Sequence, residues 1–182
     1  MKTLVSVFFL AAVIVIGVGG ASVASAQDGG AYTPFMLSFA APLEVPFRDF
    51  DVGGLRLSII YGECRDFDGL DLGLAGRATG HGNGLQSCAI NIIDGDGVGL
   101  QANWLVGFVK GEYVGFQVGA VNYAEKAQAL QIGALYNGAN DMQGVQIGLI
   151  NVARTMVGVQ IGLVNVIQDN DVPFMPIVNC SF

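Results

Sequence analysis

Apolar residues alternate with small or polar residues along most of the chain, in a phrase that recurs every 14 to 16 residues. The phrase reads G-Φ-Q-Φ-G-Φ-Φ-N, where Φ is apolar, and its clearest copies begin at Gly144 and Gly158. Alternation with a period of two predicts β-strands. The glycine density excludes helix, because each glycine costs about 1 kcal/mol in a helix interior. The copies begin at residues 54, 69, 84, 99, 115, 129, 144 and 158, so we predict an all-β repeat domain over residues 54–168.

Each unit has the length of one coil of a β-solenoid, and we predict about eight coils of 14–16 residues. We expect the apolar column of each phrase, such as Val145, Ile147 and Leu149, to point into the core. Small residues after the phrase, such as Ala124 and Ala153, suit an interior corner. A later apolar residue, such as Ala127 or Met156, would belong to the second strand of the coil.

Two polar positions of the phrase also repeat. We expect the asparagine at the eighth position to stack as a structural ladder at a corner of the coil. These asparagines are Asn91, Asn122, Asn137, Asn151 and Asn165. The glutamine at the third position predicts either a recognition surface or a ladder whose amides satisfy one another. These glutamines are Gln86, Gln101, Gln117, Gln131, Gln146 and Gln160.

The copy that begins at Gly99 departs from the phrase after its glutamine. It contains Trp104, with Phe108 and Tyr113 close behind it in the sequence. An exposed aromatic cluster would bind carbohydrate or protein, whereas an irregular coil would bury these rings. We take the three aromatic residues, together with Gln117, Gln131, Gln146 and Gln160, as a candidate interaction surface. Asparagine is also missing here and at Gly76, so we expect the asparagine ladder to be interrupted at both places.

The alternative fold is a small antiparallel outer-membrane β-barrel, with one strand and one turn in each unit. The terminal Phe182 and the alternating residues before it are typical of such a barrel. A spanning strand needs about 9–11 residues and an apolar band about 25 Å tall. The apolar column here holds only three residues, such as Leu55, Leu57 and Ile59, so we favour the solenoid.

The repeat block contains no proline, which is expected of a hydrogen-bonded ladder because proline has no backbone donor. The five prolines are Pro34, Pro42, Pro46, Pro173 and Pro176. We therefore expect residues 27–53 and 169–182 to cap the two ends of the solenoid. The flat, glycine-flanked faces between the caps also suit self-association.

Residues 1–26 have the features of a cleaved secretory signal. Lys2 is followed by an apolar run over residues 4–18, and the sequence Ala-Ser-Ala precedes Gln27. We expect an exported protein of one domain, at the cell surface or in the outer membrane or periplasm. Loss of Lys2 would change the formal net charge from −7 to −8, and the remaining cations are scattered, so binding to nucleic acid is not expected.

No grouping of residues predicts an enzyme, a cofactor or a metal site. His81 is the only histidine, and its glycine-rich surroundings contain neither a nucleophile nor an orienting acid. The Asp-Gly sequences near Asp66 and Asp94 are typical of turns. Three cysteines, Cys64, Cys88 and Cys180, allow one disulfide or none.

The amino-acid sequence of the repeats resembles that of a known family. The stretch GVQIGLINVARTMVGVQIGLVNVIQDN, the earlier GLRLSIIYGECRDFDGLDLGL and the close PFMPIVNCSF are similar to bacterial surface-repeat proteins of the leptospiral type, which carry tandem GLQIGLxN units. The resemblance covers about residues 36–182 and implies a location at the cell surface or in the envelope. It implies no activity and no site residues. From the sequence we expect a non-enzymatic structural or interaction scaffold, with a protein or carbohydrate partner and no cofactor, and we keep an integral outer-membrane barrel as the alternative.

Overall fold

The computed structural model of the protein describes residues 31–40, 43–45 and 49–182. The predicted signal, residues 1–26, lies outside the described residues, as does part of the predicted N-terminal cap. Among the described residues, no helix is long and apolar enough to cross a membrane.

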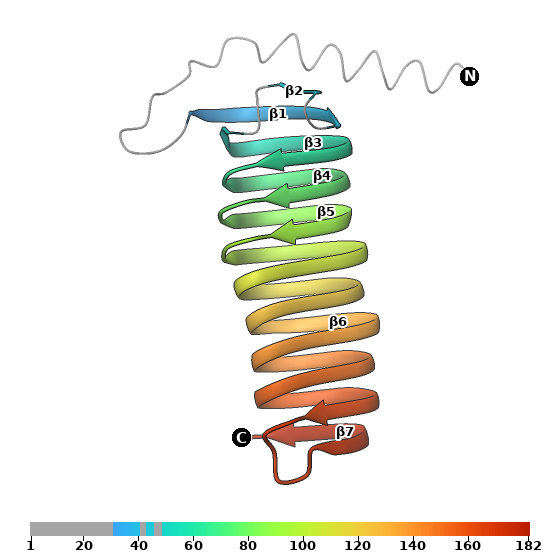
Figure 1. The fold of residues 1–182 in the computed structure, drawn as a ribbon. Helices are drawn as coiled ribbons and strands as arrows, with labels where there is room; N and C mark the ends of the chain where they lie inside the picture. The colour runs from blue at the N-terminus through green and yellow to red at the C-terminus, as the bar shows by residue number, and fades with distance from the viewer. Residues whose placement is uncertain (1–30, 41–42, 46–48) are drawn as a thin grey trace, which may run out of the picture.

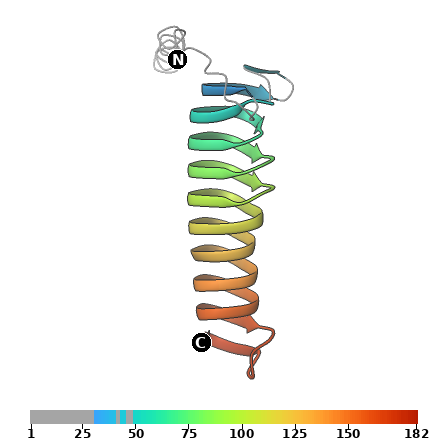
Figure 2. The same cartoon turned by 90° about the vertical axis from the view of Figure 1, so that its left-hand side faces the viewer.

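The described chain winds as a β-solenoid, as the repeat predicts (Figure 1, Figure 2). Its strands are β1 (Tyr32–Ala40), β2 (Leu43–Val45), β3 (Asp51–Cys64), β4 (Phe67–Ala78), β5 (Gly82–Ile93), β6 (Gly97–Ile167) and β7 (Phe174–Ser181). They form one sheet in the order β2-β1-β3-β4-β5-β6-β7. β3, β4 and β5 each provide one coil, and β6, continuous over 71 residues, provides the coils that follow (Figure 1).

Neighbouring coils from β3 to β6 pair in parallel, each phrase lying against the same phrase of the next coil. Gly54 pairs with Gly69, Gly69 with Gly84 and Gly84 with Gly99. The backbone hydrogen bonds therefore run between coils, along the axis of the solenoid. The alternative of an antiparallel barrel is wrong, because successive units of the repeat lie parallel.

The glycine that opens the phrase turns the chain at a corner of the coil. Its φ angle lies in the left-handed range, +133° at Gly144 and +145° at Gly158, which glycine adopts without a steric cost. A Cβ atom on Gly158 would also overlap the carbonyl oxygen of Gly144 in the preceding coil. Both constraints explain why this position is glycine in every copy except the one that begins with Ala129.

The two faces of the phrase are reversed relative to the prediction. The glutamine side chains are buried in the interior, and Gln146 has no exposed surface. The neighbouring aliphatic residues point outward, with Ile147 36% and Leu149 43% exposed. The prediction that the aliphatic column fills the core is therefore wrong. A period of two separates the faces of a strand, but it does not say which face the coil encloses.

The apolar part of the core comes from the residues that follow the phrase. Ala124 and Ala153 are fully buried and Met156 is 5% exposed, as predicted. The main cluster comprises Ile93, Val109, Tyr113, Ala124, Ala127, Ala129, Ala139, Met142, Ala153, Met156 and Ile167. A smaller cluster at the N-terminal end comprises Met36, Val52, Cys64, Phe67 and Ala78. The core thus combines polar columns from the phrase with apolar columns from the rest of the coil.

Pairs of successive outward residues mark the other corners of the coil. In the coil that begins at Gly144, Leu149 and Ile150 are both exposed, as are Arg154 and Thr155. With the glycine corner, these pairs divide the coil into three sides. The first six residues of the phrase form one side, and the corner at Arg154 lies between the other two.

Additional strands cover both ends of the solenoid. β1 pairs in parallel with β3, and β2 pairs with β1 in the antiparallel direction. At the other end β7 turns back and pairs with the end of β6, from Gly158 with Ser181 to Val166 with Phe174. The outer edge of β7 is irregular, because Pro176 has no backbone donor and Ile177 has a φ of +72°. Such irregularities discourage the addition of another strand.

Candidate interaction surface

The first side of most coils presents aliphatic and aromatic side chains outward, in columns along the solenoid, the exceptions being the polar Ser87 and the buried Ala89. We call these columns, at the second, fourth and sixth positions of the phrase, the apolar face. The second column is Leu55, Leu70, Leu85, Leu100, Phe116, Leu130, Val145 and Val159. The fourth is Leu57, Leu72, Ser87, Ala102, Val118, Ile132, Ile147 and Ile161, and the sixth is Ile59, Leu74, Ala89, Trp104, Ala120, Ala134, Leu149 and Leu163. No charged side chain stands in these columns.

Large side chains of the apolar face are exposed along much of its length. Near the middle, Trp104 is 73% and Phe116 is 54% exposed, and close to the C-terminal end Leu163 is 65% exposed. A contiguous exposed apolar surface of more than a few hundred Å² is rare on a soluble monomer and marks an interaction site.

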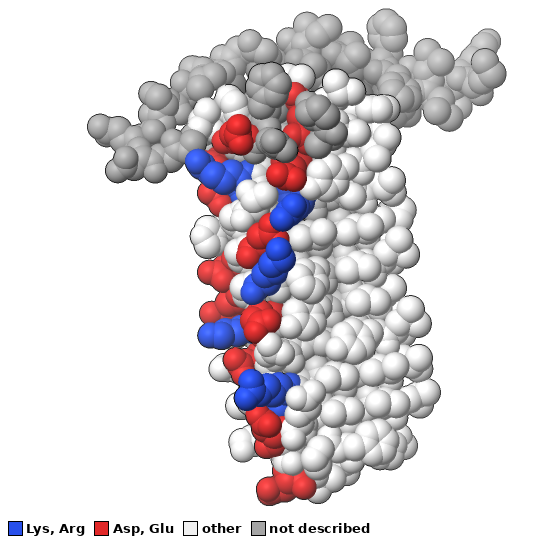
Figure 3. Space-filling model, in the orientation of Figure 1, with Lys and Arg blue, Asp and Glu red and all other residues white. Residues whose placement is uncertain are grey.

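Charged side chains gather along one edge of the solenoid, which we call the charged edge (Figure 3). The edge follows the corner at which Arg154 pairs with Asp169, and its charges are linked from coil to coil. Arg77 and Lys110 both contact Asp94. Partial burial alone would raise the pKa of Asp94, but hydrogen bonds from these two cations lower it. Asp94 is therefore held between two cations, although acidic residues outnumber Lys and Arg in the chain by 15 to 8.

The predicted aromatic cluster is divided between the surface and the core. Trp104 is exposed, whereas Tyr113 is only 2% exposed and donates a hydrogen bond to the carbonyl oxygen of Gly99 at 3.0 Å. Phe108 stacks on Tyr123 of the next coil, with ring centroids 5.0 Å apart. The prediction that Tyr113 belongs to a surface with Trp104 is wrong, because the ring fills the interior beside Gly97.

The glutamines form an internal ladder instead of a surface. Each amide nitrogen donates to the glutamine oxygen of the preceding coil, at 2.7 to 3.1 Å. Gln117, Gln131, Gln146 and Gln160 have no exposed surface, so their predicted role in an interaction surface is wrong. The ladder ends on the carboxylate of Asp71, which accepts from Gln86 at 3.4 Å. Because an ionised carboxylate only accepts hydrogen bonds, Asp71 favours one direction for every amide in the ladder.

The asparagines form a second internal ladder, with the opposite direction of donation. Asn122 donates to Asn137 at 2.9 Å, Asn137 to Asn151 at 2.8 Å and Asn151 to Asn165 at 2.8 Å. Each of these three amides gives its other hydrogen to a backbone carbonyl of the next coil. All five predicted asparagines are fully buried, Asn91 included.

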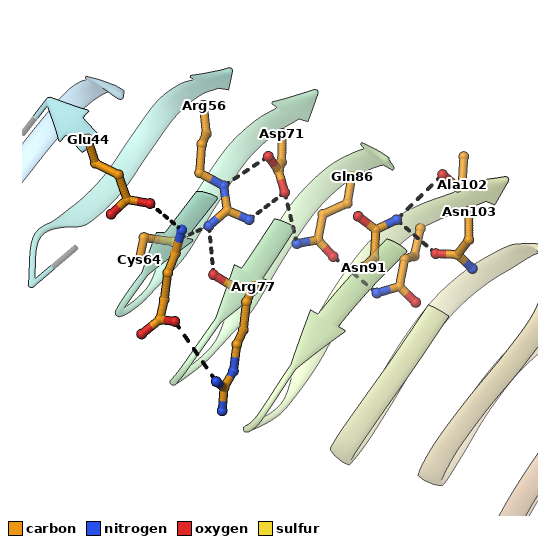
Figure 4. Close-up of polar contacts among 11 residues, drawn as sticks. Glu44, Arg56, Cys64, Asp71, Arg77, Gln86, Asn91, Ala102 and Asn103 are labelled. Carbon is orange, nitrogen blue, oxygen red and sulfur yellow. Dashed lines mark hydrogen bonds and ion pairs between the residues drawn. The ribbon is translucent and has the colours of Figure 1, made fainter. Parts of the chain in front are cut away.

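The asparagine ladder is continuous through the disturbed copy, contrary to the prediction. Asn91 donates to Asn103 at 2.8 Å (Figure 4). Asn103 donates to Asn122, also at 2.8 Å. This copy has Asn103 where the regular phrase has its second glycine, and Gly107 where the regular phrase has asparagine. A Cβ atom on Gly107 would collide with the amide of Asn103. The Asn103 side chain therefore occupies the space that the regular asparagine would fill.

A buried ion pair closes the N-terminal end of the glutamine ladder (Figure 4). Arg56 and Asp71, both with fully buried side chains, stand at the glutamine position of their phrases. The Arg56 Nε lies 2.9 Å from Asp71 Oδ1, and Nη1 donates to the carbonyl oxygen of Arg77 at 2.8 Å. Burial alone would lower the pKa of Arg56, but Asp71 raises it, so this guanidinium stays charged. Sequence reasoning missed this pair, although its spacing of one repeat was visible.

The described chain has three free cysteines. Cys64 and Cys88 are buried and Cys180 is exposed. Burial raises the pKa of Cys64 to about 12, and burial also raises the pKa of Cys88. Both buried thiols are therefore poor nucleophiles near neutral pH.

Candidate chemistry outside the ladders is sparse. His81 is exposed, and its Nδ1 lies 3.9 Å from Asp96 Oδ2. No group of three or more His, Cys, Asp or Glu side chains in the described ranges is arranged to hold a metal ion. Comparisons with protein families, curated proteins and solved structures find no match to the chain.

Proposed function

We propose that the protein is an exported, non-enzymatic scaffold of the cell surface or envelope, which holds a partner on its apolar face. We also propose that it is related to the leptospiral-type surface-repeat proteins that its repeats resemble. Export is supported by the features of residues 1–26, and the scaffold role is supported by the rigid parallel ladder between coils. This proposal replaces the integral barrel, because the fold is a solenoid.

The apolar face is the observation that carries the proposal. Its three columns run through every phrase from Leu55 to Leu163 without a charged side chain. The core does not require leucine or isoleucine at outward positions, because a polar side chain there would leave the apolar area buried in the interior unchanged. Exposed apolar surface of this extent is stabilised when a partner covers it.

Cell fractionation of the full chain tests the proposal. We expect the protein in the envelope fraction or at the cell surface, where added protease reaches it, and we expect Leu149→Asp to release it into the soluble fraction. Gln143→Asp is the matched control, because it adds the same charge at an exposed position outside the apolar face. Recovery of the wild-type chain in the cytoplasm, with residues 1–26 still attached, would overturn the proposal.

A carbohydrate partner is a second candidate, favoured by the exposure of Trp104. Indole faces stack on sugar rings, and Trp104 is the only tryptophan of the chain. Titration with surface polysaccharide should therefore change the intrinsic tryptophan fluorescence. An unchanged spectrum at saturating polysaccharide would rule this candidate out.

A further inference from the structure

We infer that the partner on the apolar face is a second copy of this chain, packed face to face with the two solenoid axes antiparallel. The inference rests on the proposed function, because it names the occupant of the same surface. The interface would be formed by the outward aliphatic columns, and the buried glutamine face would not contribute to it.

The area of the apolar face reaches the size that a specific dimer needs. Its columns run over eight phrases, or about 34 Å at the ~4.8 Å spacing of paired strands. With a width of five residues and their side chains, the face covers roughly 600 Å². Specific interfaces start near 600 Å² per partner, and homodimer interfaces are the more apolar class.

The side-chain sizes along the fourth column favour the antiparallel arrangement. The column is small at Ser87 and Ala102 and becomes larger at Val118 and Ile132. A two-fold axis along the strand direction places Ser87 opposite Ile132 of the second copy, and Ala102 opposite Val118. A parallel arrangement would place Ser87 opposite itself and Ile132 opposite itself, leaving a gap at one level and crowding at another.

A hollow on the C-terminal part of the apolar face supports the same arrangement. It has a volume of about 410 Å³ and is lined by Leu149, Ile161, Leu163 and Ile177, together with Ala134 and two glycines. The antiparallel two-fold brings the first coils of the second copy over this hollow. Leu74, which is 52% exposed, then lies opposite Leu149 and can enter it.

The charge distribution favours a second copy over a lipid surface. The acidic chain carries a formal net charge of −7, and among the residues that the structure describes no row of lysine or arginine flanks the apolar face to meet anionic headgroups. Arg65, Arg77, Lys110 and Arg154 are paired with carboxylates. The charged edge lies between the other two sides of the coil, so two copies can meet without bringing their acidic groups together.

Sedimentation velocity tests the inference. The sample is the protein purified from cells that express the full-length gene, with whatever processing those cells carry out. Cys180→Ser is used as the background, because an exposed thiol could form a trivial cross-link. We expect a concentration-dependent dimer, which Ile132→Asp converts to monomer and Gln143→Asp leaves unchanged. Circular dichroism of both variants should retain the β spectrum, because both side chains point outward.

Several outcomes would overturn the inference. These are a wild-type monomer, a dimer that survives Ile132→Asp, and a monomer that floats with phosphatidylcholine or phosphatidylglycerol vesicles, the last of which would assign the face to lipid. A monomer that is retained in the envelope, and that Leu149→Asp releases, would contradict the dimer and agree with the proposed function. Failure of the proposed function is different, since it would appear as a cytoplasmic protein whatever its oligomeric state.

Discussion

At the scale of single residues, Asn103 and Gly107 exchange the two places that glycine and asparagine hold in the regular phrase. The asparagine position needs an amide that reaches the neighbouring coils, and the glycine position needs empty space for that amide. Either residue can supply the amide if the other is glycine. The two positions therefore act as one unit, and each single change should damage it.

A double-mutant cycle tests this coupling. Asn103→Gly should leave Asn91 and Asn122 without their partner, at a cost of about 1–3 kcal/mol for each buried group that loses its hydrogen bond. Gly107→Asn should destabilise by crowding two amides. The double variant recreates the nine-residue form of the phrase that begins at Ala129, in which Gly133 and Asn137 hold these two places, and it should unfold in urea close to the wild-type midpoint. Additive losses in the double variant would contradict the exchange.

The buried thiols give a second residue-scale prediction. Because burial raises the pKa of Cys64 to about 12, only about one thiol in ten thousand is ionised at pH 8. We expect Ellman's reagent to titrate one thiol rapidly in the folded protein, Cys180, and three thiols in urea. The pKa in the folded state is raised, so the free energy of unfolding should fall as pH rises above about 9. Rapid reaction of two thiols in the folded protein would contradict the buried placement.

Sequence reasoning at this scale found the residues but not their relation. The five asparagines were visible as a column, whereas Asn103 appeared as an interruption because it lies out of register in the alignment of phrases. Arg56 and Asp71 were hidden in the same way, although both stand where the other phrases have glutamine. The roles of Asn103, Arg56 and Asp71 become clear only from the structure, which shows the side chains that they contact in neighbouring coils.

At the scale of elements, β7 covers the exposed strand edge at the C-terminal end of the solenoid. Each coil offers its backbone donors and acceptors to the next, so the last coil would expose a complete row of them without β7. β7 covers this row in the antiparallel direction and presents Pro176 and the irregular Ile177 at its own edge. The formation of strands and the need for caps follow from the sequence, because period, glycine and proline positions are local signals. The strand lengths do not follow from it, because the sequence predicts a separate second strand in each coil, whereas β6 continues through its corners for 71 residues.

Removal of β7 tests its role as a cap. A chain that ends at Gln168 should form assemblies larger than those of the full chain, because its last coil can pair with another strand edge. Removal of Phe182 alone is the control, since this residue is 92% exposed and lies outside the paired region. Equal sedimentation of the shortened and full chains would show that β7 is dispensable.

At the scale of the whole molecule, the solenoid has polar ladders inside and aliphatic columns outside. Hydrophobicity alone predicts the reverse, and the prediction was wrong for this reason. The interior of a coil is narrow, and stacked amides satisfy one another at the spacing between coils. Unpaired oxygens remain at one end of each ladder, at Asn91 Oδ1 and Gln160 Oε1. The aliphatic residues are then left outside, where a partner can cover them.

The most direct test of this arrangement is the labelling of single cysteines around one corner of a coil. Cysteine is placed in turn at positions 146, 147, 149, 150 and 151, in the Cys180→Ser and Ile132→Asp background, and its reaction with a maleimide is timed. The structure predicts rapid labelling at 147, 149 and 150 and slow labelling at 146 and 151, because Leu149 and Ile150 both face outward at a corner. Rapid labelling at 146 with protection at 147, or strict alternation through 149 and 150, would contradict it.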